Sequence, residues 1–309
     1  MKFSKKNSIF KNLNYDLRQN TSLFLMLGIP LVILIVFSYI PLYGLQIAFK
    51  DYHILQNIWE ADWVGLKYFK SFLEYYDFGK LLKNTILLNL YDLVLTPIPV
   101  VFALCINYCP IKKVKNIVQT VSIVPHFISL VVVCGLVTRF LSVDGIINEF
   151  SSLLGNDATN YLTKGELFRS IYVWSGAWQN AGYSAIIYIS ALSEVSVSQH
   201  EAAEMDGASI FQKIRYIDLP NILPIFAVNL VFKCGAMFSN NYEKVLLLQN
   251  NFNLQYSEVI STYTYEIAFK GIMPQYSLAM AIGIMSSIVN FMMLMIVKKI
   301  TRKWERICE

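Results

Sequence analysis

Charged residues are scarce in this 309-residue sequence. Asp, Glu, Lys and Arg make up only 15% of it, whereas 55% of the residues are hydrophobic, and the mean hydropathy is +0.46. Soluble globular domains carry about a quarter charged residues, so the composition argues against an ordinary soluble domain. The net charge is +5, but the Lys and Arg residues gather beside apolar runs rather than along one face. That distribution favours a membrane surface over nucleic acid as the partner.

The sequence also lacks cysteines and histidines at the spacings that are typical of disulfide scaffolds or metal sites. The five cysteines and three histidines form no CxxC pair and no metal-ligand spacing, which argues against a disulfide scaffold and a zinc site. We therefore predict no metal and no catalytic residues. The phosphate-binding patterns GxxxxGKS and GxxxxGKT do not occur either, so the chain does not cradle ATP phosphates in that way, and we expect it to bind no cofactor itself. The cysteines are Cys105, Cys109, Cys134, Cys234 and Cys308.

Long apolar runs are what the sequence does contain. A helix needs about 20 apolar residues to cross the hydrocarbon core, and six runs reach that length. The first run is too long for a signal peptide and no A-x-A site follows it, so we interpret it as an uncleaved span. The sequence thus predicts an all-α integral membrane protein with six transmembrane helices. The predicted spans are 22–48, 84–108, 116–140, 170–193, 219–240 and 277–297.

Basic residues set the predicted orientation. They precede the first span, fill the turn 109–115 and follow the last span, and the positive-inside rule makes this side cytoplasmic. We therefore expect a multi-pass bacterial cell-membrane protein with both termini in the cytoplasm. It would comprise a cytoplasmic N-terminal segment 1–21, a transmembrane domain 22–297 with a cytoplasmic loop 198–224, and a basic cytoplasmic tail 298–309.

Three features leave alternatives open. Aromatic residues in the outer loop 49–83 suit either an interfacial belt or a surface for an external partner. Prolines interrupt the first three spans. They indicate either the ordinary packing of a helix bundle or kinked helices around a cavity. Small residues at four-residue spacing in the last span, Ala279, Gly283 and Ser287, permit close helix contact within this chain or with a second subunit.

Two charged residues lie within predicted spans. Asp92 and Lys233 would each cost about 3 kcal/mol alone in the membrane, so such residues face a wet cavity or each other. The alternatives are a structural ion pair, Lys233 reaching outward to the membrane surface, and part of a polar pathway for a hydroxyl-rich solute. Aromatic, amide and carboxylate groups that suit a sugar in such a pathway are Trp174, Trp178, Tyr183, Asn240, Asn241, Tyr242 and Glu243.

The polar stretch 201–224 separates the fourth and fifth spans. Ser198 and Glu201 have capping-box spacing, which predicts a helix from about Gln199. Gly207 permits a sharp bend, a second short helix is expected over 209–216, and Pro220 would end it. Local rules therefore predict a compact helix–turn–helix knob on the cytoplasmic side.

The knob resembles the EAA motif of ABC importer permeases, the inner-membrane components of binding-protein-dependent transport systems. Beyond the motif, the stretch 242–250 and the segment before the last span resemble the sugar-permease class, in its complex oligosaccharide branch. The sequence departs from the pattern at His200, where a tyrosine is common, and at Asp92, where a basic or neutral residue is expected. The residues that match the motif are Glu201, Ala202, Ala203, Asp206, Gly207, Ala208, Phe211, Ile217, Leu219 and Pro220.

The resemblance implies a type I ABC importer permease fold whose knob is a coupling helix seated in a groove of an ATPase subunit. It also implies a second permease subunit, so that a heterodimer is expected, together with an ABC ATPase dimer that holds ATP and Mg. An extracellular solute-binding lipoprotein and membrane lipid complete the expected partners, and nucleic acid is not among them.

The expected function is thus uptake of a complex oligosaccharide by a transporter subunit that is not an enzyme. The alternatives are an importer for amino acids, polyamines or phosphate, and a membrane enzyme using Asp92 or His126. The enzyme is disfavoured because an aspartyl protease needs two intramembrane acids and His126 lacks nearby metal-ligand companions.

Overall fold

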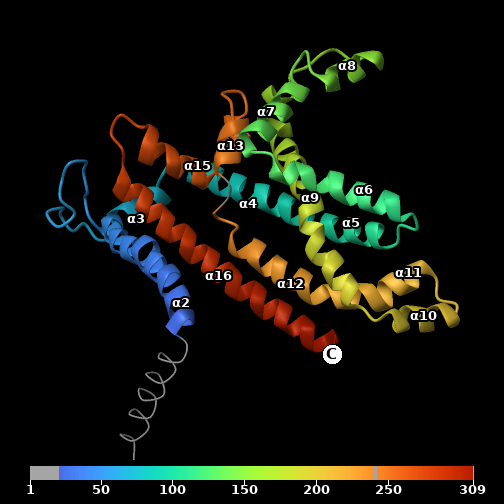
Figure 1. Ribbon diagram of the computed structural model, residues 1–309. Coiled ribbons are helices and arrows are strands. Elements are labelled where there is room, and N and C mark those ends of the chain that lie inside the picture. The colour runs from blue at the N-terminus through green and yellow to red at the C-terminus, as the bar shows by residue number, and fades with distance from the viewer. Residues whose placement is uncertain (1–20, 240–241, 309) are drawn as a thin grey trace, which may run out of the picture.

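The computed structural model describes residues 21–239 and 242–308 (Figure 1). The predicted segment 1–21 therefore lies almost entirely outside the described residues, as do Asn240 and Asn241. Short 3₁₀ or π segments are labelled η. In chain order the helices are α2 Thr21–Leu34, η1 Ile35–Tyr39, η2 Ile40–Phe49, α3 Lys67–Leu73, α4 Phe78–Val94, α5 Ile98–Asn107, α6 Lys112–Ile123, η3 Val124–Phe127, α7 Leu130–Leu141, α8 Ile146–Leu153, η4 Tyr161–Thr163, η5 Gly165–Leu167, α9 Phe168–Glu194, α10 Val197–Met205, α11 Ile210–Lys213, η6 Ile214–Asp218, α12 Leu219–Gly235, α13 Tyr242–Leu248, α14 Leu254–Ser257, α15 Ile260–Tyr265, η7 Glu266–Lys270 and α16 Tyr276–Cys308.

The all-α prediction is confirmed, although the count of six spans is not reproduced in full. In the described part of the chain, β pairing is limited to one isolated bridge between Lys50 and Trp63. The predicted span 170–193 coincides with α9, which has 27 residues but carries too many polar ones to count as apolar. The five described helical stretches that are long and apolar enough to cross a membrane are Phe24–Phe49, Phe78–Asn107, Leu130–Leu153, Ile210–Gly235 and Tyr276–Thr301.

Prolines break the second and third predicted spans. The second begins at Phe78 rather than at residue 84 and is interrupted between α4 and α5, where Pro97 precedes the first residue of α5. The third is not one continuous crossing over 116–140, because η3 around Pro125 separates α6 from α7. Proline has no N–H for the helix and clashes with the preceding turn. Ser129 then caps α7 by accepting a hydrogen bond from the Val132 amide.

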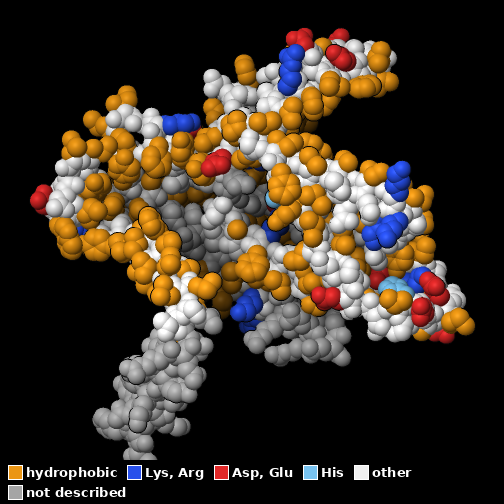
Figure 2. All heavy atoms as spheres, viewed as in Figure 1, with side chains coloured by type: hydrophobic (Ala, Val, Ile, Leu, Met, Phe, Trp, Pro, Cys, Tyr) orange, Lys and Arg blue, Asp and Glu red, His pale blue; other side chains and the backbone are white. Residues whose placement is uncertain are grey.

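Helix α9 lies at the centre of the bundle, packed against α4, α5, α6 and α12, while α16 packs along α12, η2 and α3 (Figure 1). Hydrophobic side chains such as Leu25, Met26 and Phe37 point outward along α2 and η1, and Figure 2 shows orange side chains over this part of the surface. A surface of this kind suits lipid, since helices satisfy their own backbone groups and expose only apolar side chains.

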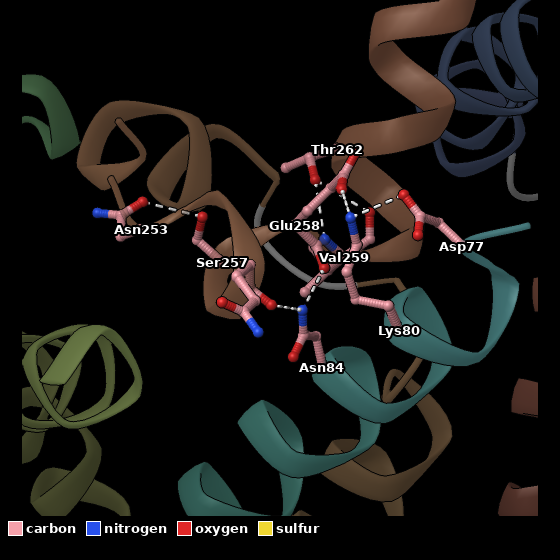
Figure 3. A network of polar contacts seen from close by, with 9 residues as sticks. Asp77, Lys80, Asn84, Asn253, Ser257, Glu258, Val259 and Thr262 are labelled. Carbon is pink, nitrogen blue, oxygen red and sulfur yellow. Dashed lines mark hydrogen bonds and ion pairs between the residues drawn. The ribbon is translucent and has the colours of Figure 1, made fainter. Parts of the chain in front are cut away.

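A buried polar network fastens α4 to the segment before α15 (Figure 3). The Asn84 side-chain amide is 2% exposed and donates to the carbonyl oxygens of Gln255 and Glu258, at 3.0 Å each. Its own Oδ1 accepts from Arg169 Nη2 at 2.8 Å. One turn earlier, Lys80 bridges Asp77 and Glu258 at 2.9 and 2.7 Å. These contacts hold α4, α9 and α14 in one arrangement.

Replacing Asn84 by Ala is expected to destabilise the protein by about 3 kcal/mol, because two backbone carbonyls and an arginine lose a buried partner. The measurement is thermal unfolding of the purified protein in detergent. Asn89→Ala is the matched control, since the Asn89 amide donates only to Thr85 O on its own helix, at 2.6 Å. The control should cost less than about 1 kcal/mol, and equal losses in the two variants would contradict the role given to the network.

Candidate functional site

The predicted knob is present as α10, a turn at Gly207, and the helical arm α11–η6. Gly207 has φ +76°, a backbone conformation that glycine adopts readily and other residues avoid. Its amide donates to Glu204 O at 3.0 Å, and the Ala208 amide donates to Ala203 O at 2.8 Å. These two bonds satisfy the last carbonyls of α10 and reverse the chain, as expected at a glycine C-cap.

Two local predictions for the knob were wrong. Helix α10 begins at Val197, after an N-cap Ser196 whose side chain makes no capping hydrogen bond, so Ser198 and Glu201 form no capping box. The capping box lies in the second arm instead, where the Ser209 hydroxyl accepts from the Gln212 amide and the Gln212 side chain accepts from the Ser209 amide. Pro220 does not end that arm, because it stands in the first turn of α12, where a helix needs no N–H from it.

The two arms of the knob are joined by an ion pair. Lys213 Nζ lies 2.7 Å from Glu204 Oε1, and this hydrogen bond lowers the pKa of the Glu204 carboxyl. The motif side chains point outward for the most part. Phe211 is 83% exposed, although a large aromatic side chain normally gains from burial. The remaining exposed motif residues are Glu201, Ala202, Asp206, Gly207, Leu219 and Pro220, whereas Ala203 and Ala208 are half-buried.

Asp218 connects the knob to the helix bundle. The Asp218 side chain is fully buried and accepts from the Tyr108 hydroxyl, at the end of α5, at 2.6 Å. His200 Nε2, from α10, lies 3.3 Å from the other carboxylate oxygen. The helical stretch Ile210–Gly235 is 26 residues long, or about 39 Å at 1.5 Å per residue. The second arm of the knob is therefore continuous with α12.

Tyr108→Phe is expected to lower the free energy of unfolding by about 2 kcal/mol, because a buried carboxylate oxygen loses its hydrogen-bond donor. Thermal unfolding in detergent measures the loss. Tyr76→Phe serves as the control, since the Tyr76 side chain is 97% exposed, and it should change stability by less than about 0.5 kcal/mol. A Tyr108→Phe protein as stable as this control would show that Asp218 does not need the tyrosine.

A cavity of about 790 Å³, whose wall carries several polar side chains, lies between α4, α9 and α12. It brings together three of the predicted pathway residues. Lys233 Nζ lies 2.8 Å from Asp92 Oδ2 and also donates to Asp92 O and to Thr96 Oγ1, at 3.0 and 3.1 Å. Tyr183 lines the same cavity and stacks on His126, with ring centroids 3.8 Å apart. The two charges that the sequence places within spans therefore pair with each other at the cavity wall.

The other predicted pathway residues that the structure describes do not line this cavity. The Trp174 indole donates to the Tyr91 hydroxyl at 3.0 Å, and Trp178 is exposed. Tyr242 stacks on Tyr265, with ring centroids 5.1 Å apart, in a separate hollow, and Glu243 is exposed.

Sequence reasoning missed several polar residues of the cavity wall. Those on α9 recur every three or four residues and so share one helix face, a pattern that could have identified them. Lys244 was missed because it follows Tyr242 and Glu243 and precedes an apolar run. The missed polar lining residues are Thr96, Tyr172, Gln179, Asn180, Ser184, Tyr188, Asn229 and Lys244.

His126 lies in η3, the short helical segment between α6 and α7. Its Nδ1 lies 3.0 Å from Asn180 Oδ1. Within residues 21–239 and 242–308, no group of three His, Cys, Asp or Glu side chains is placed to hold a metal ion.

Comparison with known proteins places these features in context. Residues 76–306 match the family model described as binding-protein-dependent transport system inner membrane component. The chain is 35% identical to the Bacillus subtilis polygalacturonan/rhamnogalacturonan transport system permease protein YteP, over 95% of this chain and 92% of the relative. It is 32% identical to Bacillus subtilis protein LplB, over 94% of this chain and 91% of that one.

A solved structure agrees with these relatives. The crystal structure of a bacterial ABC transporter involved in import of the acidic polysaccharide alginate contains a chain that is 34% identical. It superimposes with a TM-score of 0.86 over 94% of this chain and 99% of the other. The fold, the family match and the identity over nearly the whole length agree. The chain therefore belongs to the binding-protein-dependent transport system inner membrane components, which are transporter permease subunits and not enzymes.

Proposed function

We propose that this chain is one permease subunit of an ATP-driven importer for a complex oligosaccharide, and that the knob at 197–220 couples it to a separate ATPase subunit. The observation that carries most weight is the knob itself, which exposes Glu201, Asp206 and Phe211 on a short element held by its own ion pair. The similarity to permeases named for polygalacturonan/rhamnogalacturonan and arabinooligosaccharides supports the substrate class.

The exposed motif residues are assigned to the contact with the ATPase. Ala202 and Ala203 let a partner surface approach α10 closely, Phe211 fills an apolar pocket of the partner, and Glu201 provides a negative charge. Gly207 sets the angle between the two arms. ATP and Mg are held by the ATPase dimer and not by this chain.

Continuity of the second arm with α12 offers a mechanical route from the ATPase to the cavity. A movement of the knob displaces η6 and α12 together, and α12 carries Asn229 and Lys233 to the cavity wall. The hydrogen bond between Tyr108 and Asp218 passes the same movement to α5. Rocking of these helices would expose the cavity alternately to the two sides of the membrane, as in alternating access around a central site.

The lining of the cavity suits a sugar. Asn180 and Asn229 are amides that hydrogen-bond hydroxyl groups, and the Asp92–Lys233 pair offers a carboxylate and an ammonium group at the wall. Tyr183 presents an aromatic ring that can pack on the C–H face of a pyranose. We therefore propose that these side chains contact the sugar as it passes through the cavity.

The remaining partners follow from the same assignment. A second permease chain completes the pathway as a heterodimer, a solute-binding lipoprotein delivers the sugar from outside, and lipid surrounds the helices. Both termini and the knob lie in the cytoplasm. A related alginate transporter has been solved in complex with an alginate pentasaccharide-bound periplasmic protein.

The test is ATP hydrolysis by the complete complex, reconstituted in proteoliposomes with its binding protein, against a panel of solutes. Stimulation by a complex oligosaccharide is expected, with no response to amino acids, polyamines or phosphate. Stimulation by one of those other solutes alone would overturn the assigned substrate while leaving the coupling role of the knob in place.

A further inference from the structure

Lys244 places a buried cation at the wall of the cavity. Its side chain is 4% exposed, and its ammonium group donates to Tyr172 O at 2.8 Å and lies 4.7 Å from the centre of the Tyr172 ring. An ammonium group has three N–H donors, and burial of a cation is unfavourable unless an anion accompanies it. Since the hydrogen bond to Tyr172 O uses one of these donors, the ammonium group can still donate to a further partner.

No carboxylate of the described residues forms an ion pair with Lys244. Among the residues that the structure describes, no Asp or Glu oxygen lies within 4.0 Å of its ammonium group. Asp92, the acidic residue of the cavity wall, is already paired with Lys233 at 2.8 Å. Because that pair is neutral as a unit, Lys244 leaves one excess positive charge facing the cavity.

Gly176 leaves room for this ammonium group at the cavity wall. A Cβ atom at position 176 on α9 would lie 2.9 Å from Lys244 Nζ, inside ordinary contact distance, so a larger residue there would displace the flexible end of the lysine side chain. Gly176 and Lys244 both line the cavity. The glycine on α9 and the lysine on α13 thus lie side by side at the same place in the cavity wall.

We infer that Lys244, whose ammonium group lies beside Gly176 at the cavity wall, binds a carboxylate on the transported sugar, so that the pathway favours uronate-containing oligosaccharides over neutral ones. This inference rests on the proposed function. A charge-assisted hydrogen bond between ammonium and carboxylate is about twice as strong as a neutral one, and the low dielectric of a cavity strengthens it further. The neutral amides of Asn180 and Asn229 make no such distinction between acidic and neutral sugars.

The test uses two variants of the reconstituted complex with its binding protein and ATPase. Lys244→Met removes the charge and keeps most of the apolar stem, whereas Gly176→Ala displaces the flexible end of Lys244 without removing it. The probes are tetragalacturonate and a neutral galacto-oligosaccharide of equal length. Both variants should raise the KM for uptake of tetragalacturonate about tenfold, the equivalent of one lost 1.4 kcal/mol interaction, and leave the neutral sugar within about twofold.

The control is Lys270→Met, which removes an exposed lysine of η7 paired only with Glu266 and should change neither KM. Equal losses for the acidic and the neutral sugar would overturn the inference, because they indicate a structural role for Lys244. Uptake of the neutral sugar alone by the wild type would also overturn it, with the importer assignment intact. If neither sugar nor any other oligosaccharide were transported, the proposed function itself would fail.

Discussion

Replacing Gly207 by valine is expected to lower oligosaccharide uptake about tenfold or more while the helices stay folded. The φ angle of +76° is strained for a β-branched residue by roughly 1–3 kcal/mol, and each 1.4 kcal/mol is about a tenfold change in an equilibrium constant. No atom lies within 4 Å of a Cβ built at this position, so the effect comes from the backbone angle between the two arms and not from a clash. The measurement is the amount of sugar transported per ATP hydrolysed, which should fall when the knob no longer couples the two processes.

Gly155→Val is the matched control. Gly155 has φ +81° and is equally free of contacts, but it follows α8 far from the knob in the sequence. Both variants carry the same strain, so a similar loss of stability is expected in each. Only Gly207→Val should reduce the amount of sugar moved per ATP. If Gly155→Val reduced that ratio as much, the effect would reflect general destabilisation and the knob would have no special part in coupling.

Lys233→Met is expected to destabilise the protein by about 2 kcal/mol, because it leaves the Asp92 carboxylate at the cavity wall without a counter-ion. Removal of one partner from a fully buried pair costs roughly 3–5 kcal/mol, and this pair is partly exposed, at 35% and 40% for the two side chains. The loss is measured by thermal unfolding in detergent. A second substitution, Asp92→Asn, should restore most of the stability, since it removes the unpaired charge.

Lys270→Met provides the comparison for this pair. The ion pair between Lys270 and Glu266, at 3.3 Å, lies at the surface, and exposed pairs contribute only about 0–1 kcal/mol. A Lys233→Met loss no larger than that of Lys270→Met, or a failure of Asp92→Asn to restore stability, would contradict the importance given to the intramembrane pair.

The sequence predicted the fold through features that local physics decides. Apolar runs of about 20 residues identified the long helical stretches, and the turn at Gly207 adopts the left-handed conformation that its place between two helical arms suggested. The pairing of Asp92 with Lys233 was one of the alternatives that the sequence left open, and it follows from the cost of an isolated charge in the membrane. Helix α9 is the one predicted span that is not among the long apolar stretches of the described chain. Its polar side chains line the cavity and lower the hydropathy of the helix.

Tertiary contacts account for what could not be predicted. Capping-box spacing at Ser198 and Glu201 was misleading, because the chain direction at the end of α9 places the start of α10 at Val197. Pro220 looked like a helix stop, yet the π-helical segment η6 leads directly into α12, and Pro220 stands in the first turn of α12 without ending the helical stretch. Lys244 was invisible as a cavity residue because only the fold brings α13 against α9. Residue types predict local structure, whereas long-range packing selects among the outcomes they allow.

The most direct test of the coupling assignment is cross-linking from the knob to the ATPase subunit. A single cysteine replaces Met205, which is 89% exposed at the end of α10, in a chain whose native cysteines are changed to serine, and a second chain carries the cysteine at the fully exposed Leu55. A bifunctional thiol reagent applied to the assembled complex should join Met205→Cys, and not Leu55→Cys, to the ATPase subunit, with a yield that changes when ATP is added. A cross-link from position 55 and none from position 205 would contradict the account.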